Sequence, residues 1–209
     1  MTPVQNSCKC CGECCRRGGP VLHCSDLPLI RKDYLQRKDI VQLRFGEPVN
    51  DYITGEIKLL DREIFKIRGK SNTDWTCKFL DEKSNLCRIY EYRPLQCRLL
   101  KCWDTSELET AYDKNLLSVN DLVRENSGMQ ELVDFYARKC PVGEILELIR
   151  NIPGYTWQKN PRIREQIEFD RKFRQNFLEK TGEHPDICDF YFGRPVEDIL
   201  PLLKRYLEL

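Results

Sequence analysis

The segment Cys8-Lys9-Cys10-Cys11-Gly12-Glu13-Cys14-Cys15 decides how the first part of this chain folds. Two residues separate Cys8 from Cys11 and Cys11 from Cys14, and turns of that length let successive sulfurs converge on one cation or cluster. Gly12 suits a turn that requires a positive φ. Residues 1–24 have little apolar periodicity and cannot bury enough side chains to order themselves. We therefore expect a bound metal to hold this segment.

A second group of cysteines follows at regular intervals. Nine residues separate Cys77 from Cys87, and nine separate Cys87 from Cys97. The first two flank the turn of a predicted hairpin, where cross-strand side chains lie close enough to share a metal. Cys97 falls in the first turns of a helix that begins at Pro94, where exposed backbone N–H groups favour a thiolate. The spacing therefore predicts a second set of metal ligands.

The cysteine count indicates metal or redox chemistry rather than disulfides. The chain has 209 residues and 12 cysteines, and no apolar run follows Met1. No stretch of about 18 apolar residues is present, so we expect neither a secretory signal nor a membrane span. The expected location is the cytoplasm, whose reducing conditions keep cysteines as thiols that bind metal or do redox work.

Charge is distributed unevenly along the chain. Net charge is +1, but residues 1–103 hold 19 Lys/Arg against 13 Asp/Glu, whereas residues 104–209 hold 15 against 20. Metal-bound cysteines are thiolates, and their negative charges would offset the basic excess of the first half. No recognition motif for DNA or RNA accompanies the charge, and we expect no nucleic-acid partner.

Residue patterns predict an α+β fold. We expect a helix from the N-cap Ser25 to about Lys38, strands over 56–60 and 63–68, and a hairpin with arms 75–80 and 86–90. A short helix is expected over Leu95–Lys101. Further helices are expected over 121–126, 129–138, 142–151, 162–180, 186–192 and 196–207. We predict one compact domain over 1–209, with a cysteine-rich loop and hairpin half (1–103) packed on a predominantly helical half (104–209).

These motifs together resemble a known family. The order Cys8-x-x-Cys11-x-x-Cys14-Cys15, then Cys77-Lys78-Phe79-Leu80, then Cys87-Arg-Ile-Tyr-Glu-Tyr-Arg-Pro-Leu-Gln-Cys97-Arg resembles the YkgJ-type CxxCxxCC family of zinc- or iron-chelating domains. A downstream Cys-Pro, here Cys140-Pro141, also matches, so the resemblance covers about residues 8–141. It implies eight metal ligands: Cys8, Cys11, Cys14, Cys15, Cys77, Cys87, Cys97 and Cys140.

Eight thiolates suit two four-ligand sites, and three assignments are open: two zinc ions, one or two iron–sulfur clusters, or one of each. Structural zinc usually draws on paired Cys-x-x-Cys knuckles, and the second cysteine group contains no such pair. Because of this, an iron–sulfur cluster is preferred over zinc. Flagellin lysine methylase carries a similar cysteine pattern, and that likeness implies a distant analogy to a cluster-dependent methyltransferase.

Four cysteines and both histidines lie outside the implied ligand set. Cys188 is expected to be a buried apolar residue, Cys102 to pack near the site, and His23 with Cys24 to be a conceivable ligand pair. The role of Cys10 stays open.

Three functions are compatible with these features. The chain is an electron-transfer, sensing or cluster-carrier protein, an enzyme whose cluster activates a substrate, or a zinc-stabilised protein that binds a protein partner. No phosphate-binding glycine loop, Gly-x-Ser-x-Gly or His-Glu-x-x-His occurs, so catalytic residues remain unassigned.

Overall fold

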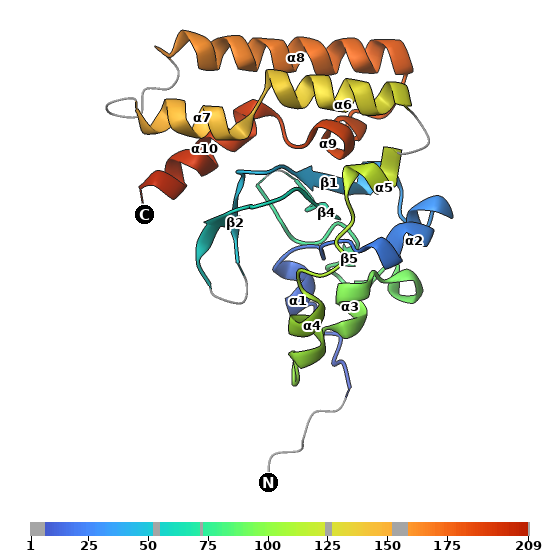
Figure 1. The fold of residues 1–209 in the computed structure, drawn as a ribbon. Coiled ribbons are helices and arrows are strands. Elements are labelled where there is room, and N and C mark those ends of the chain that lie inside the picture. The colour runs from blue at the N-terminus through green and yellow to red at the C-terminus, as the bar shows by residue number, and fades with distance from the viewer. Residues whose placement is uncertain (1–6, 52–54, 72, 124–126, 152–158, 209) are drawn as a thin grey trace. The chain divides into compact units, whose positions relative to one another are not determined.

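The computed structural model describes residues 7–51, 55–71, 73–123, 127–151 and 159–208, and it confirms the predicted α+β class (Figure 1). Its internal contacts divide the chain into two compact units. Unit 1 takes residues 1–40 and 64–122, and unit 2 takes residues 41–63 and 123–209. Unit 2 thus includes a segment from the cysteine-rich half of the sequence. The arrangement as one domain divided near residue 103 stays a prediction.

Unit 1 consists of short elements joined by turns. Its helices are α1 (Glu13–Arg16), α2 (Leu27–Arg31), α3 (Leu95–Leu99) and α4 (Ser106–Ala111), with 3-10 turns η1 (Cys24–Asp26), η2 (Arg37–Asp39) and η3 (Tyr90–Tyr92). Its strands are β4 (Ile64–Ile67), β5 (Leu80–Asp81) and β6 (Leu86–Cys87). The antiparallel pair β5–β6 places Leu80 opposite Cys87 and confirms the predicted hairpin. Helix α5 (Val119–Val123) leads from unit 1 into unit 2.

The predicted helix from Ser25 to Lys38 is wrong in length, because the α-helix covers only Leu27–Arg31. Asp33 adopts a left-handed conformation with φ of 57°, which turns the chain away from the helix axis. The N–H of Asp33 donates to the carbonyl of Ile30 at 3.1 Å, a hydrogen bond typical of helix C-termini, and the N–H of Leu35 donates to the carbonyl of Leu29 at 3.0 Å. Leu35 is fully buried, so its burial stabilises the turn that ends the helix.

The prediction that Pro94 starts a short helix is confirmed, since α3 begins at Leu95. The N–H of Leu95 donates to Oδ1 of Asp26 at 2.8 Å, and Oδ2 of Asp26 accepts the N–H of His23 at 3.0 Å. Asp26 is fully buried and satisfies one exposed N–H of α3 from a distant part of the sequence. This carboxylate fixes the start of the helix that carries Cys97.

Unit 2 contains the long helices. They are α6 (Ser127–Lys139), α7 (Val142–Arg150), α8 (Pro161–Thr181), α9 (Ile187–Phe192) and α10 (Val196–Leu207), and its strands are β1 (Ile40–Leu43), β2 (Pro48–Asn50) and β3 (Ile57–Leu59). Strands β2 and β3 pair antiparallel. Helix α10 packs on α7 and α8, and α6 packs on α9. Five predicted helices agree within two residues, while residues 124–126 of the predicted helix 121–126 lie outside the described part.

The core of unit 2 explains why the helical predictions succeeded. Leu200 and Leu203 are fully buried, as their spacing on one face of α10 predicts. Phe192 packs edge-on against Phe173 and Phe177, with ring centroids 4.9 and 5.0 Å apart. Cys188 is 3% exposed, which confirms the prediction of a buried thiol. Within the described residues, no helix is both long and apolar enough to cross a membrane.

Candidate metal centre

Seven of the eight cysteines that the sequence predicts as ligands lie in unit 1, and Cys140 lies in unit 2. All twelve cysteines are thiols, without disulfides. Five of the seven form a group that we call the inner thiols. They are Cys14, Cys15, Cys77, Cys87 and Cys97.

The inner thiols come from three separate elements. Cys14 and Cys15 lie on α1, Cys87 on β6 and Cys97 on α3, while Cys77 precedes β5. The N–H of Cys77 donates to the carbonyl of Cys15 at 2.7 Å and joins α1 to the hairpin. The Sγ atoms of Cys14 and Cys15 are 3.9 Å apart. The two motifs recognised in the sequence therefore meet in unit 1.

Side-chain contacts fasten the first motif to the hairpin. Gly12 has a φ of 75°, as its position between ligands predicts, and a Cβ there would lie 2.7 Å from Nη1 of Arg16. Arg16 donates to the carbonyl of Cys11 at 2.7 Å and also to Oδ1 of Asn85 in the hairpin turn. The turn at Gly12 is what brings this guanidinium close to the backbone.

The inner thiols interact through their charges. Burial raises the pKa of Cys97, and the neighbouring thiols of Cys77, Cys87 and Cys14 raise it further. Burial likewise raises the pKa of Cys77, with a further contribution from Cys87. Several thiolates this close together are unfavourable unless a cation offsets their charge, since each disfavours ionisation of the others. A thiophilic metal would supply that charge and displace the protons.

Cys14 and Cys15 form a pair in which one thiol stabilises the other's thiolate. The pKa of Cys14 is lowered to about 6, mainly by a hydrogen bond from the Cys15 thiol; backbone N–H groups and Arg93 act in the same direction, and burial opposes them. The same hydrogen bond raises the pKa of Cys15. Cys14 is therefore the thiol most readily ionised before metal arrives.

Arg93 is the cation placed beside these thiols. Its charge contributes to the lowered pKa of Cys14 and opposes the rise in the pKa of Cys97 and Cys10. Its Nε donates to the carbonyl of Tyr90 at 2.8 Å, and its guanidinium lies 3.5 Å from the centroid of the Tyr90 ring. This contact holds a positive charge beside the cysteine group.

A second group, which we call the outer thiols, consists of exposed cysteines: Cys8, Cys10, Cys11 and Cys102. The charge of Cys8 is the main cause that raises the pKa of Cys10. Burial raises the pKa of Cys102, with smaller contributions from Cys14, Cys11 and Cys8. Cys10 and Cys102 lie outside the predicted ligand set. Their closeness in sequence to predicted ligands is the signal that could have found them: Cys10 directly precedes Cys11, and Cys102 follows Cys97 by five residues.

The inner thiols suit zinc or iron. Both metals bind thiolates, and all five donors of the inner thiols are sulfur atoms. Within the described residues, no three His, Cys, Asp or Glu side chains are already arranged to hold a metal ion. Metal binding would therefore have to draw the thiols closer together. Coupling of this kind between metal binding and local ordering is common in cysteine-rich segments.

His23 and Cys24 have different surroundings. His23 is 1% exposed, and its Nδ1 lies 2.8 Å from the carbonyl of Lys114, while its Nε2 has no partner among the described residues. Cys24 is exposed, and its thiol faces the carbonyl of Leu116 and the carboxylate of Asp121. Their conceivable role as a ligand pair stays a prediction.

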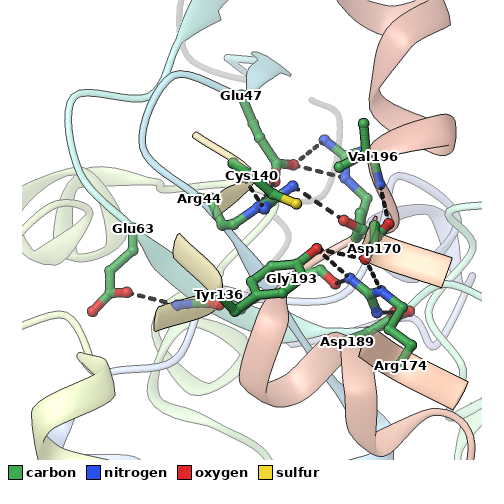
Figure 2. A network of polar contacts seen from close by, with 12 residues as sticks. Arg44, Glu47, Glu63, Tyr136, Cys140, Asp170, Arg174, Asp189, Gly193 and Val196 are labelled. Atoms are coloured by element: carbon green, nitrogen blue, oxygen red, sulfur yellow. Dashed lines mark hydrogen bonds and ion pairs between the residues drawn. The ribbon is translucent and has the colours of Figure 1, made fainter. Parts of the chain in front are cut away.

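Cys140 lies inside unit 2, at the end of α6 (Figure 2). It is 1% exposed, its thiol donates to the carbonyl of Gln166 at 3.8 Å, and its own carbonyl accepts from Arg44 at 3.2 Å. Burial raises the pKa of this thiol to about 12. Its prediction as a ligand comes from the Cys-Pro motif, and its surroundings in unit 2 are those of a packed core residue.

The residues around Cys140 form a buried polar network (Figure 2). Asp170 accepts from Tyr136 at 2.7 Å and from Nε of Arg174 at 2.6 Å, and Arg174 also reaches Asp189 at 3.1 Å. A second part of the network joins three residues: Glu47, Arg44 and Arg194. Three arginines face three carboxylates, so the charges balance. The arrangement is that of a structural core.

The model of the CxxCxxCC family, described as a "putative zinc- or iron-chelating domain", matches residues 7–115 of this chain. A protein of Methanocaldococcus jannaschii, named "Uncharacterized protein MJ0661", is 37% identical over 99 residues, which cover 47% of this chain and 46% of the relative. The match thus spans about half the length of that relative. No solved structure matches the chain.

Proposed function

This chain belongs to the CxxCxxCC family of zinc- or iron-chelating domains, and we propose that unit 1 holds an iron–sulfur cluster on the inner thiols. Metal binding in general follows from the family, whose matched residues include all nine cysteines of the inner and outer thiols. The identity of the metal and the roles of individual cysteines are the parts that we propose.

The grouping of five inner thiols from two distant motifs carries the proposal. The residues that would hold the cluster are Cys14, Cys15, Cys77, Cys87 and Cys97. Structural zinc and iron–sulfur clusters both usually take four cysteine ligands, and the cluster is preferred because the second cysteine group lacks the paired Cys-x-x-Cys knuckle that structural zinc usually uses. Arg93 lies beside the group and would offset part of the negative charge of a thiolate-bound cluster. When bound, such a cluster supplies one-electron transfer.

An electron-transfer or sensing role is the activity that we propose. Cys14 is exposed, whereas Cys77 is buried, so the inner thiols extend from the interior of unit 1 to its surface. A cofactor held there would be within reach of a redox partner or an oxidant. Cluster-dependent catalysis would need a substrate site, and the described residues offer no observation that assigns one.

We leave Cys140 outside the proposed ligand set. Its thiol donates to the carbonyl of Gln166 and is almost fully buried within unit 2, so metal binding would cost it this contact and its burial.

Structural zinc is the alternative, and one observation favours it. Without Cys14, the remaining inner thiols number four, and they are all buried or half-buried. A closed set of four cysteines is the usual structural zinc site. In that case unit 1 would be stabilised by zinc, and the role of the protein would be to bind a partner.

Anaerobic purification followed by metal and sulfide analysis and a visible spectrum tests the proposal. We expect iron, acid-labile sulfide and broad visible absorption in the wild type. Cys97→Ser should lose them, while the control Cys24→Ser should keep them, since Cys24 faces Leu116 and Asp121 instead. Stoichiometric zinc from a metal-replete anaerobic preparation, without iron or sulfide, would contradict the iron–sulfur proposal and support the alternative.

A further inference from the structure

Three tyrosines with large exposed fractions gather on unit 1. Tyr34, Tyr90 and Tyr92 are 40, 43 and 43% exposed, and together with Arg93 they form what we call the tyrosine surface. They make up three of the seven large hydrophobic side chains that are exposed among the described residues. Single exposed aromatic side chains are ordinary on proteins, but a contiguous group of them marks an interaction site.

We infer that the tyrosine surface docks the acidic face of a protein partner, which supplies carboxylates to it. Tyrosine and arginine are enriched in the centres of protein interfaces, where each combines a large contact area with hydrogen-bond donors. This inference goes beyond the proposed function, because it holds whichever metal the inner thiols bind.

The side chains of the tyrosine surface are already held in place. The rings of Tyr34 and Tyr92 stack with centroids 3.8 Å apart and planes 11° from parallel, so the turn after α2 meets the 3-10 turn η3 here. The guanidinium of Arg93 lies 3.5 Å from the centroid of the Tyr90 ring, and its Nε donates to the carbonyl of Tyr90 at 2.8 Å. Side chains that are ordered before binding lose little conformational freedom when a partner docks, which favours affinity.

The charge of the two segments that meet at this surface fits an acidic partner. Residues 31–38 hold four Lys/Arg against one Asp/Glu, and residues 88–98 hold three against one. The next acidic residue, Asp39, is buried and pairs with Lys78 at 2.7 Å, so its charge is offset inside unit 1. Positive surfaces of this kind attract and orient a partner of opposite charge.

The arrangement of the rings favours a protein over a nucleic acid as the occupant. Proteins that bind single strands offer open ring faces on which bases stack. Here Tyr34 and Tyr92 cover one face of each other, and Arg93 covers a face of Tyr90. Tyrosine hydroxyls and guanidinium groups are donors that pair with carboxylates, which Asp and Glu side chains supply on a protein surface.

The tyrosine surface also belongs to a segment of the candidate metal centre. Tyr90 and Tyr92 lie in η3, which leads from Cys87 on β6 to Cys97 on α3. A partner docked there would contact the segment that joins two inner thiols. Interfaces between transient partners are small, so a surface of a few aromatic side chains suffices for such a contact.

Binding of a labelled decaglutamate peptide, measured by fluorescence anisotropy, tests this inference on the full chain purified anaerobically with its metal. We expect saturable binding at low salt that weakens as salt rises. Tyr34→Ala and Lys32→Glu should each weaken it at least about fivefold, and Tyr34→Phe, which keeps the ring, should lose less. The control Lys180→Glu makes the same charge change on an exposed residue of α8 and should bind as the wild type does.

Absence of decaglutamate binding, or equal binding by the wild type, Tyr34→Ala and Lys32→Glu, would overturn the inference. A labelled oligothymidine of equal charge that binds more tightly, and loses affinity in the same variants, would identify a nucleic-acid surface instead. Dimerisation of the wild type that disappears in Tyr34→Ala, measured by analytical ultracentrifugation, would identify a second copy of the chain as the occupant. Circular dichroism and metal analysis confirm that each variant is folded and keeps its metal.

Discussion

Cys14 and Cys15 are adjacent, yet their pKa values shift in opposite directions. The thiol of Cys15 donates to the sulfur of Cys14, so ionisation of Cys14 is favoured and that of Cys15 is opposed. Arg93, held over Tyr90, adds positive charge on the same side. The adjacent Cys15 and Arg93, an arginine of the second motif, thus favour a thiolate at Cys14 that can bind an incoming metal.

Alkylation of the reduced, metal-free protein tests this difference. At pH 7 Cys14, with a pKa of about 6, is mostly thiolate, whereas burial and Asp121 raise the pKa of the exposed Cys24. Iodoacetamide should therefore modify Cys14 before Cys24, with mass spectrometry as the readout. As the pH falls below about 6 Cys14 takes up a proton, and its advantage should shrink. Equal rates at pH 7 would contradict the account of this pair.

A second prediction at this scale concerns Arg174, which is buried between Asp170 and Asp189 in unit 2. Arg174→Gln leaves these carboxylates without their cation and should lower the free energy of unfolding by about 3–5 kcal/mol. Arg171→Gln, which removes an exposed ion pair with Glu197 from the same helix, should change stability little. Urea unfolding measures both variants. Similar losses in the two would show that burial of the network is unimportant.

At the scale of elements, sequence patterns predicted the helices of unit 2 better than the turns of unit 1. Helix α10 presents its leucines at regular spacing, and proline or glycine separates it from its neighbours. The early end of α2 was not predictable, because it depends on a left-handed Asp33 and on the burial of Leu35. The spacing of Asp170 and Arg174 indicates an i,i+4 pair on a helix surface, and their burial depends on tertiary packing.

The candidate site was predictable to a similar extent. The spacing of Cys8, Cys11 and Cys14 predicts that they converge on one metal, which stays a prediction, and the spacing does not indicate that only Cys14 lies among the inner thiols. The inclusion of Cys102 depends on the turn after α3, for which the sequence gives no period or motif. The burial of Cys140 follows from the contact between the end of α6 and α8 within unit 2, which the Cys-Pro motif does not reveal.

Gly69 gives a prediction about an element. It pairs with Cys77 across an isolated bridge, and a Cβ there would lie 2.7 Å from Cα of Trp75 and closer still to the carbonyl oxygen of Asp74. Gly69→Ala must therefore move backbone beside an inner thiol, and we expect it to destabilise the protein by about 1–3 kcal/mol and to lower its metal content. Urea unfolding and metal analysis report the two effects.

Gly143→Ala is the matched control for this substitution. Gly143 lies in α7, and an added Cβ would meet nothing within 4 Å. Alanine has less freedom than glycine in the unfolded chain, so this variant should be as stable as the wild type or more stable by up to about 1 kcal/mol. For Gly69→Ala, normal metal content would show that the position of Cys77 does not depend on its bridge with Gly69.

At the scale of the whole molecule, two units use different means of stabilisation. Unit 2 has long helices, an aromatic core and a balanced polar network around Cys140. Unit 1 has short elements, and its inner thiols disfavour one another's ionisation in the absence of a cation. We therefore place the metal in unit 1 and assign Cys140 to the core of unit 2.

Metal content of Cys97→Ser and Cys140→Ser, measured beside the wild type after anaerobic purification, tests this assignment most directly. Each substitution replaces one sulfur atom with oxygen. Cys97 belongs to the inner thiols, whereas Cys140 contacts Gln166 within unit 2. We predict that Cys97→Ser loses the resident metal while Cys140→Ser keeps the wild-type amount. Retention of metal by Cys97→Ser, or its loss from a folded Cys140→Ser, would contradict the account.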